Sequence, residues 1–349
     1  MTGGAPLDAA VIGAGSWGTA LAHLLSRNGH RVRLWSYEPR VVAELRESGE
    51  NRTYLPGIRI PDAVRVSGKL GEVVAGARLV VSVSPAQFVA EVMREAARYI
   101  DPRALVVSAS KGIETSSLRR MDEVLRAVLP GETGRRLTVL SGPSFATEVA
   151  KGQPTAVVAA SESREARLLV QRVFGSASFR VYTNPDVLGV ELGGALKNVI
   201  ALAAGVCAGL GFGHNTRTAV ITRGLAEITR LGVAMGAATS TFYGLAGIGD
   251  LVLTCTGELS RNRTVGFRLG RGEALRQILG DMHAVAEGVA TTPATHALSR
   301  RYAVEMPIVG QMHAILEEGK DPLAAVQELM LRDPRPEPEG AGDARAAGA

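Results

Sequence analysis

The sequence predicts a mixed α/β protein in which a doubly wound sheet is followed by an all-α domain. Two observations support this fold class. In the first half of the chain, short apolar runs alternate with segments of helical spacing; from about Pro185 onward, apolar residues recur three and four positions apart and β-branched runs become rare. We therefore predict a sheet domain at 1–184, a helical domain at 185–332 and a disordered tail at 333–349, where Pro, Gly, Ala and charged residues show no apolar periodicity.

The sheet is predicted to begin with the apolar run 9–12, which leads into a glycine-rich stretch and then into a helix that ends at Gly29. The run 32–35 alternates with arginines as a second strand would, so one βαβ unit is complete. Further strands are predicted at 79–83, 104–108, 137–141 and 155–159, with helices between them at 88–99 and 118–129. Helices of the second half are predicted at 187–208, 218–235, 263–271, 291–302, 307–317 and 322–331.

The composition indicates a folded globular protein, because 46% of the residues are hydrophobic and 21% are charged. The 39 basic residues exceed the 34 acidic ones, but they are scattered in short pairs, which does not indicate a nucleic-acid-binding protein. Cys207 and Cys255 lack CxxC spacing, so we expect neither a disulfide framework nor a cysteine zinc site, and no metal site is predicted. A reducing cytoplasm fits this cysteine usage best.

No secretory or membrane segment is expected in the sequence. Residues 1–10 carry no basic residue before their apolar run, and this run leads into a glycine motif instead of a cleavage site. The longest uncharged span, 231–249, is broken by five glycines and lacks the continuous apolar surface that a membrane helix needs.

The stretch GAGSWG, from Gly13 to Gly18, matches a dinucleotide-binding fingerprint in the context that the fingerprint requires, between a strand and a helix. Gly13 permits the tight turn, Gly15 lets the backbone approach a pyrophosphate, and Gly18 allows close packing of helix and strand. Ser16 and Trp17 lie on the rim of this anion site. We therefore predict a Rossmann-type domain that binds a nicotinamide dinucleotide; the alternative is a glycine turn that binds nothing.

The choice between NAD and NADP stays open in the sequence. Glu38 follows the second predicted strand but is displaced from the strand tip, where an acidic residue would hold the ribose 2′-hydroxyl of NAD. Arg40 could instead neutralise the 2′-phosphate of NADP. Either side chain could equally be a solvated charge at a helix start.

A lysine stands in an otherwise small and apolar predicted helix. Lys197 is expensive to bury there, and Gly193 and Gly194 lie on its helix face, so the surface beside its stem should be clear for a ligand. Burial and neighbouring cations both lower an ammonium pKa, which would let this lysine exchange a proton with a substrate hydroxyl near neutral pH. The alternative is a surface lysine that extends its ammonium into solvent.

Polar residues gather in two further segments of the helical half. Asp250 follows a glycine-rich stretch, and Ser260, Arg261 and Asn262 are consecutive. Arg261 offers a planar donor fork suited to phosphate oxygens, with neutral hydrogen-bonding groups on both sides. In the alternative interpretation, Asp250 and Ser260 are N-caps of the helices that follow them.

Two loops of the first half follow predicted strands. Lys111 comes after the strand at 104–108, and Gly142 and Ser144 come after the strand at 137–141. Because ligands of open α/β sheets bind at the carboxyl ends of strands, these residues are placed to meet a substrate held against the nicotinamide. For Gly142, a plain turn is the alternative.

Several long motifs closely resemble, in this order, those of bacterial NAD(P)-dependent glycerol-3-phosphate dehydrogenases over roughly 9–331. They are GAGSWGTALA, SKGIE, LSGPSFATEVA, NPDVLGVELGGALKNVIALAAG, GHNTRTAVITRGLAE, GIGDLVLTCTGELSRNR and VAEG before a Thr-Thr-Pro. The resemblance implies reversible hydride transfer between NAD(P)H and dihydroxyacetone phosphate to give sn-glycerol 3-phosphate, which feeds glycerophospholipid synthesis. It also implies a cytoplasmic enzyme without a membrane span that forms a homodimer.

For the site, the resemblance implies that Lys197 is the proton donor and acceptor. The implied substrate contacts are Lys111, Gly142, Ser144, Lys197, Asp250, Ser260, Arg261 and Asn262. The implied cofactor contacts are Gly13, Gly15, Ser16, Trp17, Gly18, Tyr37, Lys111, Ala146, Arg261, Val285 and Glu287. Two other functions remain open: a different two-domain dehydrogenase acting on a hydroxyacyl compound or another hydroxy acid, and a dinucleotide-sensing or scaffold protein without chemistry. The presence of Lys197, Asp250 and Arg261 together argues against the second.

Overall fold

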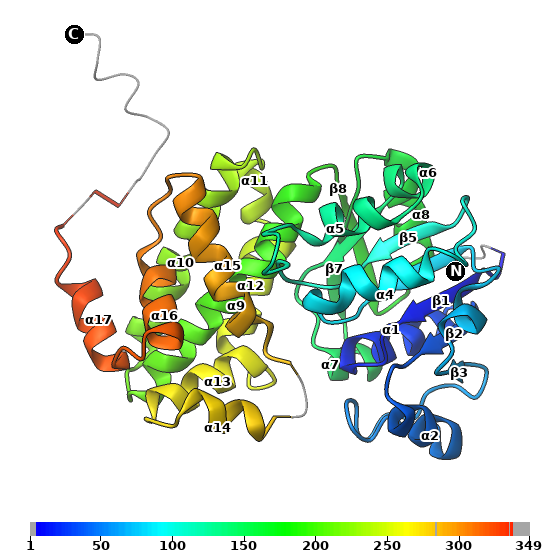
Figure 1. Ribbon diagram of the computed structural model, residues 1–349, viewed down its shortest axis with the longest axis horizontal. Coiled ribbons are helices and arrows are strands. Elements are labelled where there is room, and N and C mark those ends of the chain that lie inside the picture. Colours follow the sequence, from blue (N-terminus) through cyan, green and yellow to red (C-terminus); the bar gives the residue numbers. More distant parts are fainter. Residues whose placement is uncertain (1–4, 283–284, 335, 338–349) are drawn as a thin grey trace, which may run out of the picture.

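The computed structural model describes residues 5–282, 285–334 and 336–337. It consists of two lobes side by side, an α/β lobe built on one sheet and an all-helical lobe (Figure 1). The predicted fold class is therefore confirmed. The predicted tail at 333–349 falls largely outside the described residues.

One eight-stranded sheet forms the core of the α/β lobe. Its strands are β1 (Asp8–Ile12), β2 (Arg31–Trp35), β3 (Arg65–Ser67), β4 (Leu79–Ser82), β5 (Leu105–Ser108), β6 (Thr138–Ser141), β7 (Thr155–Ala160) and β8 (Phe179–Asn184). They lie in the order β3-β2-β1-β4-β5-β6-β7-β8 and are parallel except for the antiparallel pair β6 and β7. The order reverses between β1 and β4, and ligands of open α/β sheets bind outside the carboxyl ends of the strands at such a point.

Helices cover both faces of this sheet. All residues of β4 and β5 are buried, which explains why their sequences are continuous apolar runs and do not alternate. One face packs against α1 (Ser16–Arg27), α2 (Pro39–Ser48) and α8 (Arg164–Phe174), and the other against α3 (Leu70–Val74), α4 (Val89–Ala96) and α5 (Met121–Val128). The remaining helices of this lobe are η1 (Ala86–Phe88), α6 (Gly131–Arg135) and α7 (Ala146–Ala150).

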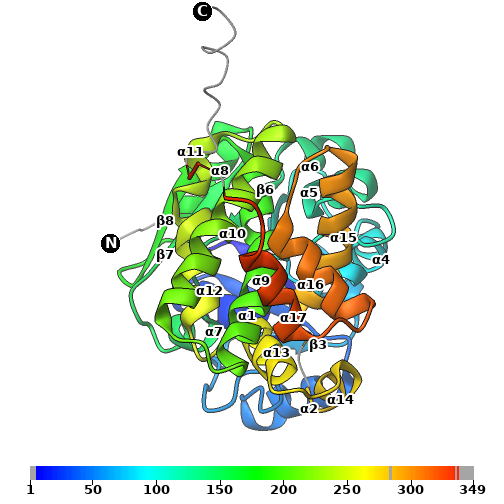
Figure 2. The ribbon, with the colours of Figure 1, turned by 90° about the vertical axis from the view of Figure 1, so that its left-hand side faces the viewer.

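The helical lobe is built around α9 (Val187–Gly209), which is buried along nearly its full length. This helix is long and apolar enough to cross a bilayer, but its apolar stretch is enclosed by the protein. The other helices are α10 (His214–Ala234), α11 (Thr239–Phe242), η2 (Leu245–Gly249), α12 (Asp250–Thr256), α13 (Arg261–Gly270), α14 (Leu275–Gly280), α15 (Glu287–Arg301), α16 (Pro307–Glu317) and α17 (Pro322–Met330). Figure 2 looks onto this lobe, with α9 among α10, α16 and α13.

Glycines bring α9 and α13 unusually close together. A Cβ on Gly205 of α9 would lie 2.2 Å from the Arg263 carbonyl oxygen, and a Cβ on Gly266 of α13 would lie 2.0 Å from the Leu202 carbonyl oxygen. Neither position can carry a larger side chain without separating the helices. This contact packs α13 against the C-terminal half of α9.

Two strands, the helices α2 and α8 and several shorter helices are absent from the predicted elements. β3 has only three residues, which is too short for a clear pattern. β8 lies at the sheet edge, and its alternation of buried and exposed side chains is a strand pattern that the predictions overlooked. The predicted helix at 187–208 corresponds to α9, and the one at 307–317 coincides with α16. The chain leaves β8 at Asn184 and enters α9 at Val187.

Candidate active site

The glycine turn between β1 and α1 fits a dinucleotide pyrophosphate. Gly13 has φ = 121°, in the left-handed region that favours glycine. A Cβ on Gly18 would lie 1.8 Å from the Gly13 carbonyl oxygen, so only glycine allows the helix to pack on the turn. A Cβ on Gly15, in contrast, would meet no atom within 4 Å, because this residue opens onto the cleft between the lobes. The free N–H groups at the start of α1 are thus accessible to an anion.

A loop between α2 and β3 braces this turn. Asn51 Nδ2 donates to the Ala14 carbonyl oxygen at 2.8 Å, and Ser16 Oγ donates to the Tyr54 carbonyl oxygen at 2.5 Å. The Tyr54 hydroxyl donates in turn to Glu38 Oε1 at 2.7 Å. The glycine turn, this loop and the segment after β2 are therefore held together by hydrogen bonds.

Two lysines from different lobes share one buried carboxylate. Lys111 follows β5 and donates from Nζ to Asp250 Oδ2 at 2.6 Å, while Lys197 of α9 donates from Nζ to Asp250 Oδ1 at 2.7 Å. Lys197 is only 7% exposed, and Asp250 is fully buried at the start of α12. The N-cap interpretation of Asp250 is wrong, because Gly249 occupies the N-cap position and the Asp250 side chain joins the lobes instead.

Burial and neighbouring charges set the pKa values in this triad of Lys111, Lys197 and Asp250. Burial lowers the pKa of Lys197 to about 8; Asp250 opposes this effect and the Lys111 ammonium adds to it. Burial would raise the pKa of Asp250, but the two ammonium groups outweigh it and hold that pKa below its ordinary value. At neutral pH the carboxylate is therefore ionised, and Lys197 is protonated but close to releasing its proton.

The Lys197 ammonium has a donor left for a ligand. It donates to Asp250 and, at 2.7 Å, to Thr254 Oγ1, whereas an ammonium group carries three N–H donors. No third acceptor is found for it within the described part of the chain, and Lys197 lines the cleft. The alternative of a lysine extended into solvent is wrong, because the side chain is buried.

The expectation that the surface beside the Lys197 side chain is clear for a ligand is also wrong. A Cβ on Gly193 would lie 2.4 Å from the Ala246 carbonyl oxygen, and a Cβ on Gly194 would lie 2.7 Å from Ser141 Oγ. These glycines make room for neighbouring parts of the protein and not for a ligand. They let α9 pack closely on η2 and on the end of β6.

The start of α13 forms the wall of the cleft opposite the glycine turn. Ser260 Oγ accepts a hydrogen bond from the Arg263 N–H at 3.3 Å, so the N-cap interpretation of Ser260 is confirmed, and this residue also lines the cleft. Asn262 Nδ2 donates to Asn198 Oδ1 at 2.9 Å, and Asn262 Oδ1 accepts from the Gly288 N–H at 2.9 Å. These bonds tie α13 to α9 and α15 at the site.

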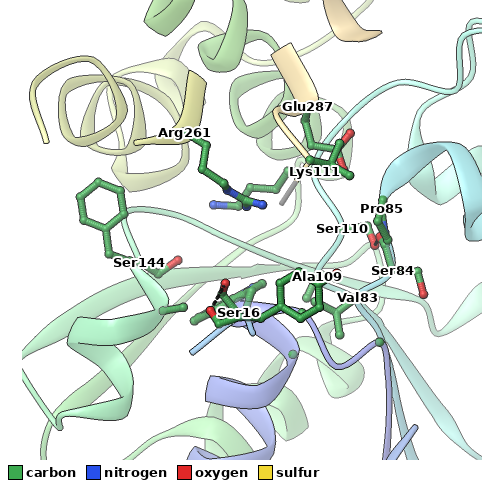
Figure 3. A pocket seen from close by; sticks show the side chains of 18 of the residues that line it. Ser16, Val83, Ser84, Pro85, Ala109, Ser110, Lys111, Ser144, Arg261 and Glu287 are labelled. Atoms are coloured by element: carbon green, nitrogen blue, oxygen red, sulfur yellow. Dashed lines mark hydrogen bonds between the residues drawn. The ribbon is translucent and has the colours of Figure 1, made fainter. Parts of the chain in front are cut away.

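Arg261 is the first residue of α13, and its guanidinium points into the cleft (Figure 3). Among the described residues, no hydrogen bond or ion pair is found for it. A guanidinium placed this way presents its planar fork to a ligand, and the ligand groups that match this fork are carboxylates and phosphates. The cleft therefore offers an anion site on the helical lobe.

The loop after β6 supports Lys111 from behind. The Gly142 carbonyl oxygen accepts hydrogen bonds from Lys111 Nζ and from Ser144 Oγ, each at 3.0 Å. Gly142 has φ = 128°, and a Cβ there would lie 3.0 Å from Val157 Cα. Gly142 therefore contributes to the site through its backbone carbonyl oxygen.

Glu287 connects the lobes at another edge of the cleft. Its Oε1 accepts from the Ala86 N–H at 3.2 Å, whereas its Oε2 is buried without a hydrogen-bond partner within the described ranges. Figure 3 shows Glu287 near Lys111, with Arg261 beside them and Ser16 across the pocket. Val285 and Ala146 line the same cleft.

These side chains enclose one cleft of about 460 Å³ between the lobes. Every predicted site residue lines it except Gly142, which lies behind Lys111. Sequence reasoning missed Thr254, Ser84 and Tyr54, which also line the cleft. Thr254 is one helical turn after Asp250, and this spacing could have pointed to it; Tyr54 lies in a loop without any pattern.

The two halves of the chain match two family models. Residues 8–167 match a model described as the NAD-dependent glycerol-3-phosphate dehydrogenase N-terminus. Residues 186–327 match the model described as the C-terminus of the same enzyme.

Curated relatives and solved structures agree with these models. The glycerol-3-phosphate dehydrogenase (NAD(P)+) of Geobacter sulfurreducens is 56% identical over 323 residues, which are 93% of this chain and 96% of the relative. That of Geobacter metallireducens is 56% identical over 327 residues, 94% and 98% of the two chains. A crystal structure of glycerol-3-phosphate dehydrogenase from Coxiella burnetii, 41% identical, superposes with a TM-score of 0.89 and covers 94% of this chain and 99% of that one.

Proposed function

The chain belongs to the NAD-dependent glycerol-3-phosphate dehydrogenase family and interconverts dihydroxyacetone phosphate and sn-glycerol 3-phosphate with NAD(P)H; we propose that Lys197 is its proton donor and acceptor. The observation that carries this proposal is the buried Lys197 ammonium, held by Asp250 and Thr254 with one donor left towards the cleft. The nicotinamide cofactor, when bound, supplies or accepts the hydride. The residues of the chain position the substrate, place positive charge beside the ketone oxygen and transfer the proton.

In the reducing direction, negative charge develops on the ketone oxygen. Lys197 donates its remaining N–H to this oxygen and then transfers the proton, which its pKa of about 8 permits near neutral pH. Asp250 keeps the ammonium in place, and Lys111 adds a second positive charge beside it. In the oxidising direction, neutral Lys197 removes the proton from the substrate hydroxyl.

Arg261 binds the phosphate group in this proposal. Its guanidinium lines the cleft, and a phosphate ester offers the oxygen pair that the guanidinium fork matches. Holding the phosphate on the helical lobe fixes the ketone carbon next to the Lys197 ammonium, which is the positioning that hydride transfer needs. Ser260 and Asn262 add neutral hydrogen-bonding groups on both sides.

In this proposal the two lobes bind different ligands. The domain at 1–184 binds the dinucleotide, with its pyrophosphate on the glycine turn, and the domain at 185–332 binds the substrate. The further cofactor contacts are Ser16, Trp17, Tyr37, Lys111, Ala146, Arg261, Val285 and Glu287, all of which line the cleft. The further substrate contacts are Lys111, Gly142, Ser144, Asp250, Ser260 and Asn262.

The same proposal extends to the cellular setting. We place the enzyme in the cytoplasm as a homodimer that supplies sn-glycerol 3-phosphate to glycerophospholipid synthesis. Two features support this setting: Cys207 and Cys255 are both free and buried, as a reducing compartment favours, and the motifs resemble those of the bacterial enzymes. Sedimentation of the purified protein measures the oligomeric state directly.

The test of the proposed function is steady-state oxidation of NADH and NADPH by dihydroxyacetone phosphate. Lys197→Met should lower kcat by roughly 10²- to 10⁴-fold while cofactor binding, followed by nicotinamide fluorescence, is retained. Lys69→Met, which removes a lysine that is 80% exposed, is the matched control. Undiminished turnover by Lys197→Met would reject the role of Lys197. Turnover of other hydroxy acids alone would favour a different dehydrogenase, and cofactor binding without any turnover would favour a sensor.

A further inference from the structure

We infer that Glu191 is a positioning residue for the reaction, because it clamps the loop that carries Lys111 to the helix that carries Lys197. The inference rests on the proposed function, since it concerns how the two lysines of that same site are held. Glu191 lies on α9, six residues before Lys197, and it does not line the cleft. It can therefore act on the reaction only through the residues that it holds.

The Glu191 carboxylate bonds to the start of α5 in the other lobe. Its Oε1 and Oε2 accept from the Asp122 N–H at 3.0 and 3.2 Å, and its Oε2 lies 3.7 Å from Arg120 Nε. Asp122 is the second residue of α5, and the first N–H groups of a helix have no partner within that helix. Glu191 of the helical lobe thus supplies an acceptor that α5 of the α/β lobe needs.

The same end of α5 is tied to the loop of Lys111. Arg120 forms an isolated antiparallel bridge with Ile113, which lies two residues after Lys111. Beside this bridge, the Glu114 N–H donates to the Arg119 carbonyl oxygen at 2.9 Å. The chain after Lys111 therefore runs alongside the residues that lead into α5. A shift of the start of α5 relative to α9 would move this loop with it.

α9 itself rests on Lys111 one turn after Glu191. A Cβ on Gly194 would lie 2.7 Å from Ser141 Oγ and 3.7 Å from Lys111 Cγ. Glu191, Gly194 and Lys197 follow one another at intervals of three residues, so about 9 Å of helix separates the first from the last. A displacement of α9 at Glu191 is therefore carried to Lys197.

A cavity of about 10 Å³ lies where these supports meet. Glu191, Lys111 and Ser141 line it together, and it has room for no more than about one water molecule. Lys111 therefore has little space in which to adjust if its support moves. Because a misplacement of about 1 Å can cost about a hundredfold in rate, a small shift at this point should be measurable.

The position of Glu191 is costly for a carboxylate, which indicates a specific role for the group. Glu191 is 8% exposed and stands between Val190 and Leu192, which are both fully buried. Burial and the Asp122 carboxylate raise its pKa well above the ordinary value, and the Arg120 guanidinium opposes them only in part. An apolar residue of similar size would be cheaper to bury, but it would leave the Asp122 N–H without this acceptor.

The test compares two substitutions that separate the reach of the side chain from its charge. Glu191→Gln keeps the length and one acceptor oxygen but removes the charge. Glu191→Asp keeps the charge but is one methylene shorter, so its carboxylate should no longer reach the Asp122 N–H. If Glu191 acts by position, kcat for dihydroxyacetone phosphate reduction should stay within about threefold in Glu191→Gln and fall at least about tenfold in Glu191→Asp. Glu191→Leu, which removes the acceptor without burying a charge, takes the place of Glu191→Asp if that variant does not fold, and the same fall is expected.

Two further measurements distinguish positioning from a loss of stability. Nicotinamide fluorescence should give the same cofactor affinity for the unmodified protein and the variants, because Glu191 does not line the cleft. Lys197 is faced by the titratable groups of Asp250, Lys111 and Cys255. The alkaline limit of reduction should move to lower pH in Glu191→Asp but not in Glu191→Gln, because a displaced Lys197 is held less closely by Asp250 while its burial persists.

Glu162→Gln and Glu162→Asp are the matched controls. Glu162 is 70% exposed and lies 3.2 Å from Arg126, which in turn lies 3.7 Å from Asp122. The same pair of substitutions at this exposed carboxylate should leave kcat and the alkaline limit unchanged.

Two outcomes would overturn the inference. They are an unchanged kcat in a folded Glu191→Asp or Glu191→Leu variant, and a lower kcat in Glu191→Gln than in Glu191→Asp, which would show that the charge matters and not the reach. Turnover by the unmodified protein distinguishes this failure from a failure of the proposed function. A protein that reduces dihydroxyacetone phosphate but gives either outcome loses only the inference on Glu191. A protein that does not reduce dihydroxyacetone phosphate loses the proposed function.

Discussion

Asp250→Asn should move the alkaline limit of ketone reduction to lower pH. The substitution keeps the shape of the side chain and removes the negative charge that Lys111 and Lys197 share. In the unmodified protein this charge opposes the burial that lowers the pKa of Lys197 to about 8. Without it the pKa should fall further, because burial and the Lys111 ammonium are then unopposed.

The size of the shift follows from one lost charge pair. Lys197 Nζ and Asp250 Oδ1 are 2.7 Å apart, and two unit charges separated by about 4 Å interact by about 4 kcal/mol at an effective dielectric constant of about 20. One pKa unit corresponds to about 1.4 kcal/mol, so the lost pair is equivalent to about three units. Asparagine still offers a carbonyl oxygen to the ammonium, and we therefore expect a net fall of about one to two units.

The assay is the pH dependence of kcat/KM for dihydroxyacetone phosphate reduction at saturating cofactor. Reduction needs protonated Lys197, so the rate of the unmodified enzyme should fall as the pH rises through about 8, and oxidation should rise over the same range. Asp62→Asn, at an exposed carboxylate, is the control and should leave the profile unchanged. A folded Asp250→Asn enzyme whose alkaline limit is unchanged or higher would refute the control of the Lys197 pKa by Asp250.

Three further predictions concern the substrate, the cofactor and the stability of the fold. Arg261→Ala should raise the KM for dihydroxyacetone phosphate at least about thirtyfold, equivalent to about 2 kcal/mol, because the phosphate loses its charged partner; an unchanged KM in steady-state assays would contradict this. Gly18→Ala should abolish cofactor binding in fluorescence titrations, because its Cβ would lie 1.8 Å from the Gly13 carbonyl oxygen, and normal affinity would show that the turn is not needed. Glu227 of α10 is buried and accepts from two N–H groups at the start of α16, and burial raises its pKa to about 7 from 4.5. The pKa of Glu227 is higher in the folded than in the unfolded state, so protonated Glu227 stabilises the fold fully below about pH 4.5. This stabilisation is lost as the pH rises through about 7, which lowers the free energy of unfolding by up to about 3 kcal/mol. Urea unfolding at acidic and alkaline pH should show this fall in the unmodified protein and a flatter dependence in Glu227→Gln, and identical dependences would disprove it.

Local patterns were sufficient for most of the regular elements. Continuous apolar runs predicted the central strands, which are buried on both faces, and spacings of period 3.6 predicted most of the long helices. The antiparallel pairing of β6 and β7 was out of reach, because strand direction depends on how the chain returns after the short helix α7. β3 and the helices of about one turn are too short for their periodicity to be recognised.

The sequence by itself determined the dinucleotide turn and the chemical types in the site. A glycine motif of this kind between a strand and a helix is typical of a dinucleotide-binding turn. A lysine buried in an apolar helix needs a charged or hydrogen-bonding partner. The sequence also displayed Arg261 next to neutral hydrogen-bonding residues. These are properties of neighbouring residues, which is why they can be read without coordinates.

Only the tertiary structure decided which of these groups meet. Asp250 is separated in sequence by 53 residues from Lys197 and by 139 from Lys111, and no local period reports a contact between such distant segments. The glycines beside Lys197 looked like space for a ligand, but they accommodate η2 and β6. The hydrogen bond from Tyr54 to Glu38 was equally invisible. The pKa of a lysine and the orientation of a carboxylate depend on burial and on partners brought together by packing, and packing is a property of the folded chain as a whole.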